Sequence, residues 1–160
     1  MEAVEIRGNK TTNDLLREAG WFLLHTLFAV LNFALVMVAF WAVKPDPLST
    51  EPKLLCTAAA FLVPMIGGFL AGRANRNTVA RYVWISALIM FGVTVVHVLD
   101  LPTGAGLCDG CGPVDKLWRT FFSIDHGSGL MAGDGLLIGT WIPLSMIGYA
   151  VGSRIAIGVE

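Results

Sequence analysis

Charged residues are scarce in this sequence: Asp, Glu, Lys and Arg make up 14% of its 160 residues, whereas 55% are hydrophobic. Soluble domains carry about 25% charged residues, so the composition argues against an ordinary soluble domain and favours a protein that is embedded in lipid. The formal net charge is −1 and no cluster of Lys and Arg occurs. Because phosphate backbones are bound by such clusters, we expect no nucleic-acid partner.

Four long stretches contain no Asp, Glu, Lys or Arg: 21–43, 54–72, 82–99 and 135–152. At about 1.5 Å per residue, helices of roughly 18 to 23 residues extend over about 27–35 Å, enough to cross a hydrocarbon core of about 30 Å. Membrane strands would be shorter and would alternate in polarity. The sequence therefore predicts an all-α membrane protein with a bundle of four transmembrane helices, and the lipid bilayer as its first partner.

The predicted organisation is a leader over 1–20, a single transmembrane domain over 21–152 that includes an outer loop at 100–134, and a tail over 153–160. The apolar stretch after the leader is too long for a cleaved signal peptide and lacks a small-residue cleavage site, so we interpret it as a retained signal anchor. Thr12 or Asn13 is expected to cap the first helix.

Orientation is predicted from Lys and Arg, which resist translocation across the membrane. Seven basic residues fall on one side of the predicted spans: Arg7, Lys10, Arg17, Arg73, Arg76, Arg81 and Arg154. The other side carries four: Lys44, Lys53, Lys116 and Arg119. This asymmetry places both termini in the cytoplasm and the outer loop outside a multi-pass cell membrane, for which we expect a bacterial inner membrane.

Glycines spaced four apart mark two of the spans. The pairs are Gly68 with Gly72, Gly135 with Gly139, and Gly148 with Gly152. Small residues at this spacing allow the backbones of membrane helices to approach closely. Spans two and four are therefore expected to form the closest pair, although the same glycines are equally suited to pairing with another subunit.

The stretch 67–73, which reads GGFLAGR, resembles the end of a span in several uncharacterised families of small four-span bacterial membrane proteins. The resemblance covers seven residues. It implies the same four-span fold and brings no activity or cofactor with it.

The outer loop contains a Cys-x-x-Cys pair, Cys108 and Cys111. Four interpretations of this pair stay open. It could be a structural disulfide, as expected on an oxidising side, a redox-active pair, a metal site completed by His97 and His126, since two Cys and two His suit tetrahedral zinc, or a pair with no special role. The second interpretation has a resemblance in general plan to the quinone-coupled disulfide enzymes. Those enzymes generally use two cysteine pairs, whereas Cys56 has no second cysteine beside it.

An amphipathic helix of about ten residues is predicted after Pro113. Its apolar face would carry Val114, Leu117, Trp118, Phe121 and Phe122, and its polar face Asp115, Lys116, Arg119, Thr120 and Ser123. Such a helix lies in the membrane interface or caps a bundle, and we expect Trp118, Phe121 and Phe122 to contact that interface.

Polar side chains within the spans need partners because lipid offers none. Trp141, near the middle of span four, requires an acceptor inside the bundle unless it faces a neighbouring subunit or lipid, and His25 is interpreted as a hydrogen-bonded histidine. The leading functional hypothesis is a non-catalytic membrane subunit or scaffold that assembles with other membrane proteins or with itself. An outward-facing thiol–disulfide or electron-transfer protein and a small channel or carrier lined by Asn32 are the alternatives.

Overall fold

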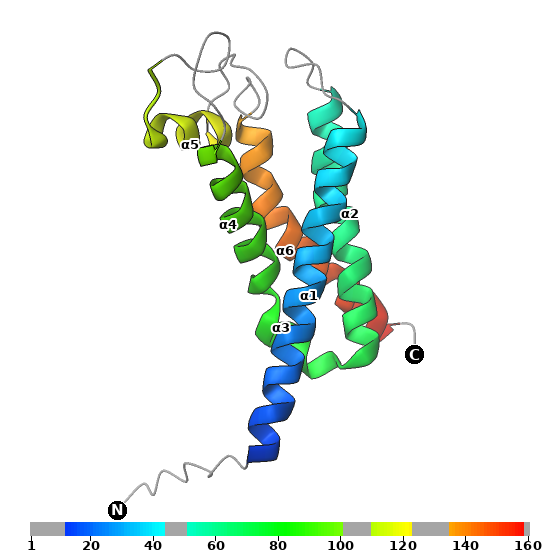
Figure 1. The fold of residues 1–160 in the computed structure, drawn as a ribbon. Coiled ribbons are helices and arrows are strands. Elements are labelled where there is room, and N and C mark those ends of the chain that lie inside the picture. Colours follow the sequence, from blue (N-terminus) through cyan, green and yellow to red (C-terminus); the bar gives the residue numbers. More distant parts are fainter. Residues whose placement is uncertain (1–11, 44–50, 101–109, 123–134, 159–160) are drawn as a thin grey trace, which may run out of the picture.

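The computed structural model describes residues 12–43, 51–100, 110–122 and 135–158, and the regular structure of these residues is α-helical, with no strand among them (Figure 1). The helices are α1 (Thr12–Val43), α2 (Glu51–Ala74), α3 (Arg76–Tyr82), α4 (Trp84–Asp100), α5 (Pro113–Phe121) and α6 (Gly135–Gly158). Helix α1 begins, and α6 ends, at the end of the molecule where α3 lies, which we call the α3 end; the opposite end is the α5 end (Figure 1).

Three helical stretches are long and apolar enough to cross a membrane: Thr12–Ala42, Lys53–Ala74 and Thr78–Asp100, the last of which joins most of α3 to α4. They cover the first three predicted spans apart from Val43. The fourth predicted span, 135–152, lies within α6, whose 24 residues are about 36 Å long at 1.5 Å per residue. An all-helical protein with membrane-length apolar helices is thus established.

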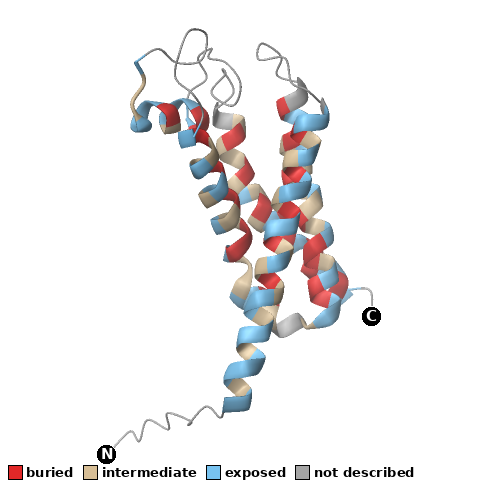
Figure 2. Ribbon diagram, viewed as in Figure 1, coloured by how far each residue is buried: buried red, intermediate tan, exposed pale blue. Residues whose placement is uncertain are grey.

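Helix α1 includes Thr12 and Asn13 as its first helical residues, so neither is its cap, and Asp14 lies in its first turn, where a carboxylate is favoured by the helix dipole. Only a narrow stripe of the helix is buried, at intervals of three and four residues: His25, Ala29, Asn32, Val36 and Phe40. Figure 2 shows most of the remaining surface of α1 as exposed. The helix therefore contributes one edge to the fold and leaves a broad apolar surface outside it.

Helices α2 and α6 cross in close contact. A Cβ atom added at Gly68 would overlap the carbonyl oxygen of Tyr149, and one at Gly152 would overlap that of Met65. At Gly72 the nearest atoms to an added Cβ are Ala156 Cβ at 3.0 Å and Ser153 Cα at 3.1 Å. The helices can approach this closely because glycine has only a hydrogen atom as its side chain. These glycines are therefore used for contact within the chain.

The charged stretch between the second and third predicted spans is largely helical. Helix α2 runs to Ala74 and α3 starts at Arg76, with the Asn75 amide donating to the Ala71 carbonyl at 2.9 Å. An ion pair across the chain, Arg81 to Glu18 at 2.7 Å, ties α3 to α1. This partner lies 63 residues away in the sequence, so local composition could not indicate it.

Helix α5 forms after Pro113 as predicted, and the amide of Gly112 donates to the Asp115 carboxylate at 3.1 Å across its first turn. Its rotation differs from the prediction. Lys116, Thr120 and Phe121 are buried, whereas the exposed edge carries Val114, Trp118 and Phe122.

The difference at α5 arises from a close contact with α6. A Cβ at Gly139 would overlap the carbonyl oxygen of Phe121, so the end of α5 lies directly on α6. Phe121 joins the apolar core, next to Phe91 with ring centroids 5.9 Å apart. Of the three predicted interfacial aromatics, Trp118 and Phe122 are therefore exposed and Phe121 is not.

Trp141 has its acceptor inside the bundle, which confirms one of the two expectations for it. Its indole N–H donates to the hydroxyl of Thr57 at 2.7 Å, and that hydroxyl in turn donates to the Lys53 carbonyl at 2.8 Å. The ring itself packs in the largest apolar cluster, edge-on to Phe40. A polar link between α2 and α6 is thus enclosed by apolar side chains.

Candidate functional site

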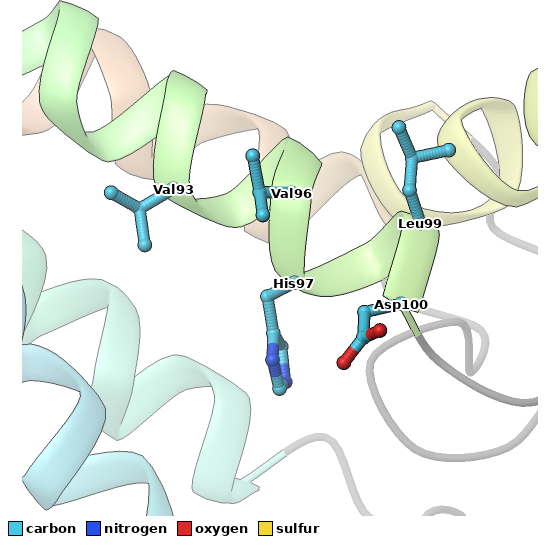
Figure 3. Close-up of a pocket in the computed structure, with 5 residues that line it drawn as sticks. All are labelled: Val93, Val96, His97, Leu99 and Asp100. Carbon is cyan, nitrogen blue, oxygen red and sulfur yellow. The ribbon is translucent and has the colours of Figure 1, made fainter.

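A cavity of about 590 Å³ opens at the α5 end and is lined by the last turns of α4, with Val93, Val96, His97, Leu99 and Asp100 on its wall. Figure 3 shows His97 and Asp100 leaving α4 on the same side, while Leu99 is directed away from them. Residues three apart share a helix face. The cavity therefore presents an imidazole and a carboxylate together at the predicted outer surface.

Two lysines are buried at the same end, although the sequence suggests solvent exposure for both. Lys53, in the first turns of α2, is 2% exposed, and Lys116 of α5 is 8% exposed. The ammonium of Lys116 donates to the Leu99 carbonyl at 3.2 Å. Carbonyls at a helix C-terminus lack intrahelical donors, so Lys116 completes the end of α4; Lys53 is also engaged in a contact within the chain.

The predicted metal and disulfide residues are only partly within the described structure. Cys108 and His126 lie outside it, so the Cys108–Cys111 disulfide and the site with His97 and His126 stay predictions. Gly110, between the two cysteines, has a φ of +73°, a conformation that favours glycine. Among the residues that the structure describes, no group of three or more His, Cys, Asp and Glu is placed to hold a metal ion.

Cys56 is a free thiol with no exposed surface, in the apolar cluster that also contains Ala60 and Trp141. A thiolate must be accessible to exchange with a disulfide. In this conformation Cys56 is therefore a packing residue, and its position provides no second thiol for a relay.

A polar cluster at the α3 end joins three helices. The imidazole of His25 lies 2.6 Å from the Tyr149 hydroxyl through Nδ1 and 3.0 Å from the Thr78 hydroxyl through Nε2. Thr78 also donates to the Asn75 carbonyl at 3.0 Å. His25 is 2% exposed, and with both ring nitrogens partnered it is the hydrogen-bonded histidine that the sequence predicted.

A second buried polar group, the side-chain amide of Asn32, lacks a hydrogen-bond partner for its nitrogen, Nδ2, among the described residues. Asn32 lies near the middle of α1 and is 4% exposed. The amide rests on α2 at Gly67, where an added Cβ would lie 2.7 Å from Nδ2 and 2.9 Å from Oδ1. An unpartnered amide donor in an apolar region costs about 1–3 kcal/mol.

Asn32 also lines a groove of about 140 Å³ between α1 and α2. The remaining walls are apolar, and those with the most exposed side chains are Leu31, Leu35, Ile66 and Leu70. The groove therefore combines an apolar, outward-facing rim with one polar group at its base. Asn32 stood out in the sequence as a polar residue within a span, but its packing on Gly67 depends on the pairing of helices and could not be predicted.

No protein-family model matches the chain, and no curated protein or solved structure was found to be similar to it.

Proposed function

We propose that this protein is a non-catalytic integral membrane subunit, a bundle of four transmembrane helices that assembles with other membrane proteins or with further copies of itself through the groove between α1 and α2. The observation that carries the proposal is Asn32, an amide donor buried without a partner beneath an outward-facing apolar rim. In lipid no water can satisfy this donor. Nδ2 itself is enclosed against Gly67, so a flip of the amide that turns the donor toward the groove would let it reach an acceptor on a neighbouring helix.

The free energy of one hydrogen bond between membrane helices is large enough to affect assembly. Hydrogen bonds between membrane helices are worth roughly 0.6 to 2 kcal/mol, which is about threefold to thirtyfold in an association constant. The apolar rim adds packing but little specificity, because lipid tails are as apolar as leucine. Asn32 is therefore the group that would set the position of a partner helix along α1.

The glycines of α2 and α6 are used for packing within the chain, so they are not the proposed contact with a partner. The space beside Gly68, Gly148 and Gly152 is filled by backbone atoms of the opposite helix within the same chain. This leaves the surface of α1 and the adjoining edge of α2 as the region for an external helix, since α1 buries only a stripe (Figure 2).

In the proposed orientation the α3 end faces the cytoplasm. Arg17, Arg73, Arg81 and Arg154 lie toward this end, near the beginning of α1, the end of α2, α3 and the end of α6. Positive side chains near the ends of spans are retained on the cytoplasmic side. Helix α5, with Trp118 and Phe122 exposed along one edge, would then lie in the outer interface.

Site-specific photo-crosslinking in intact membranes tests the proposal. A photoreactive residue at Leu35, on the rim of the groove, is expected to give a defined adduct; Leu88 on α4, with a similar exposed fraction of 54% against 47%, is the matched control position and should not. Asn32→Ala should greatly reduce the adduct at position 35. If Asn32 serves only to pack on Gly67, the adduct is unchanged by this substitution and the proposed interface is wrong.

A further inference from the structure

A cavity of about 410 Å³ lies at the α3 end, between α6 and the stretch that leads from α3 into α4. Its size is within the roughly 300–1,000 Å³ that small-ligand sites occupy. Val79, Val83 and Ile157 give it apolar walls, and Arg154 provides the charge. The combination of an apolar wall and a cation at the end of a helical bundle matches an amphiphile with an acidic head.

Arg154 differs from Arg17, Arg73 and Arg81 at this end because no described residue forms an ion pair or a ring contact with it. Arg81 is paired with Glu18 at 2.7 Å, and Arg73 lies 5.7 Å from the centre of the Phe69 ring. Arg154 is exposed, and no carboxylate pairs with it within the described residues. Its guanidinium is therefore available to an external anion, and it suits phosphate because its donors form a planar fork.

The position of the cavity along the helices fits the level of the lipid headgroups. Val79 and Val83 stand at the start of the apolar stretch Thr78–Asp100, and Arg154 is in the last turns of α6. Trp84, which follows Val83 in the sequence, is about half exposed and donates its indole N–H to the Arg81 carbonyl at 2.9 Å. Tryptophan favours the headgroup level, so Arg154 would lie where lipid phosphates lie.

We propose that this cavity binds an anionic phospholipid, with the phosphate paired to Arg154 and an acyl chain against Val79, Val83 and Ile157. The charge of the site favours an anionic over a zwitterionic lipid, because a zwitterionic headgroup carries its own cation. One basic residue near an anionic membrane surface contributes about 1 kcal/mol, so the expected preference due to Arg154 is about fivefold.

Native mass spectrometry of the full chain, released from micelles that contain phosphatidylglycerol or phosphatidylcholine with identical acyl chains, measures this preference. We expect phosphatidylglycerol to be retained about fivefold more, and Arg154→Gln to abolish the difference. Arg73→Gln removes an exposed arginine at the same end that does not line the cavity, and it should leave the difference intact. Equal retention of the two lipids, or equal effects of the two substitutions, would overturn the proposal.

A second variant separates a seated lipid from general attraction to the surface. Ala80 lines the cavity and is exposed, so Ala80→Trp should obstruct the cavity without loss of Arg154 or of folding, which thermal unfolding verifies. Retention of phosphatidylglycerol should fall in this variant, whereas undiminished retention means that no lipid enters the cavity. Glycerol phosphate, which has the head without the acyl chains, should fail to compete; effective competition would identify a free phosphate site instead and would also overturn the assignment.

Discussion

Gly152 is the position where one added methyl group should be most damaging. In Gly152→Ala the new Cβ would overlap the Met65 carbonyl oxygen and would lie 2.7 Å from the Met65 carbonyl carbon and 2.8 Å from the Phe69 amide nitrogen. All three are backbone atoms of α2, so no side-chain rotation can relieve the contact and the two helices must separate. Overpacking of this kind costs about 1–3 kcal/mol.

Gly92→Ala is the matched control, since Gly92 also lies within a helix but has no atom within 4 Å of an added Cβ. Alanine in a helix is favoured over glycine by up to about 1 kcal/mol, so this variant should be unchanged or more stable. Reversible unfolding in mixed micelles, followed by circular dichroism, gives both free energies of unfolding. Equal stability of the two variants would show that α2 and α6 do not cross at Gly152.

Two further predictions concern polar and sulfur chemistry. Thr57→Val keeps the shape of the side chain but removes the acceptor for the Trp141 indole. It should lower the free energy of unfolding by about 1–2 kcal/mol. A loss below about 0.3 kcal/mol would mean that this hydrogen bond does not contribute to stability. If Cys108 and Cys111 form a disulfide, unfolding without reductant should allow alkylation of Cys56 alone, and unfolding with reductant should allow alkylation of all three cysteines. Three alkylated cysteines without reductant would exclude the disulfide.

The helices themselves could be predicted because their signal is long and local. Four stretches without charged residues indicated where the long helices lie, and Pro113 with the apolar residues after it indicated α5. The glycine spacing in spans two and four also indicated the helix pair that the structure has in closest contact, at Gly68 and Gly152. Each of these signals resides within a few turns of one helix.

What could not be predicted depends on partners that are distant in sequence. The rotation of α5 follows from the contact of Phe121 with Gly139, and the burial of Lys116 follows from the free carbonyl of Leu99 at the end of α4. The helical stretch Arg76–Tyr82 is held by Glu18. Amphipathic periodicity indicates that one face of a helix is apolar, but it does not indicate which edge of that face another helix will cover.

The same limit applies to the groove. Asn32 was recognisable as a polar residue in an apolar span. The leading hypothesis gave it no role, and only the alternative of a channel or carrier used it, as a pore-lining residue. The structure places it on Gly67, beneath the rim between α1 and α2. This arrangement places a single unpartnered amide beneath the apolar rim that we propose for assembly, which neither residue indicates alone.

The mass of the protein extracted from its own membrane in polymer nanodiscs, without detergent, tests the central claim most directly. The chain has a mass of 17.2 kDa. We predict that the wild-type protein is found in particles whose protein mass exceeds that of one chain, and that Asn32→Ala shifts it to single chains while the free energy of unfolding shows that the bundle is still folded. Wild-type particles with a protein mass of 17.2 kDa, or assemblies that Asn32→Ala leaves intact, would contradict the account.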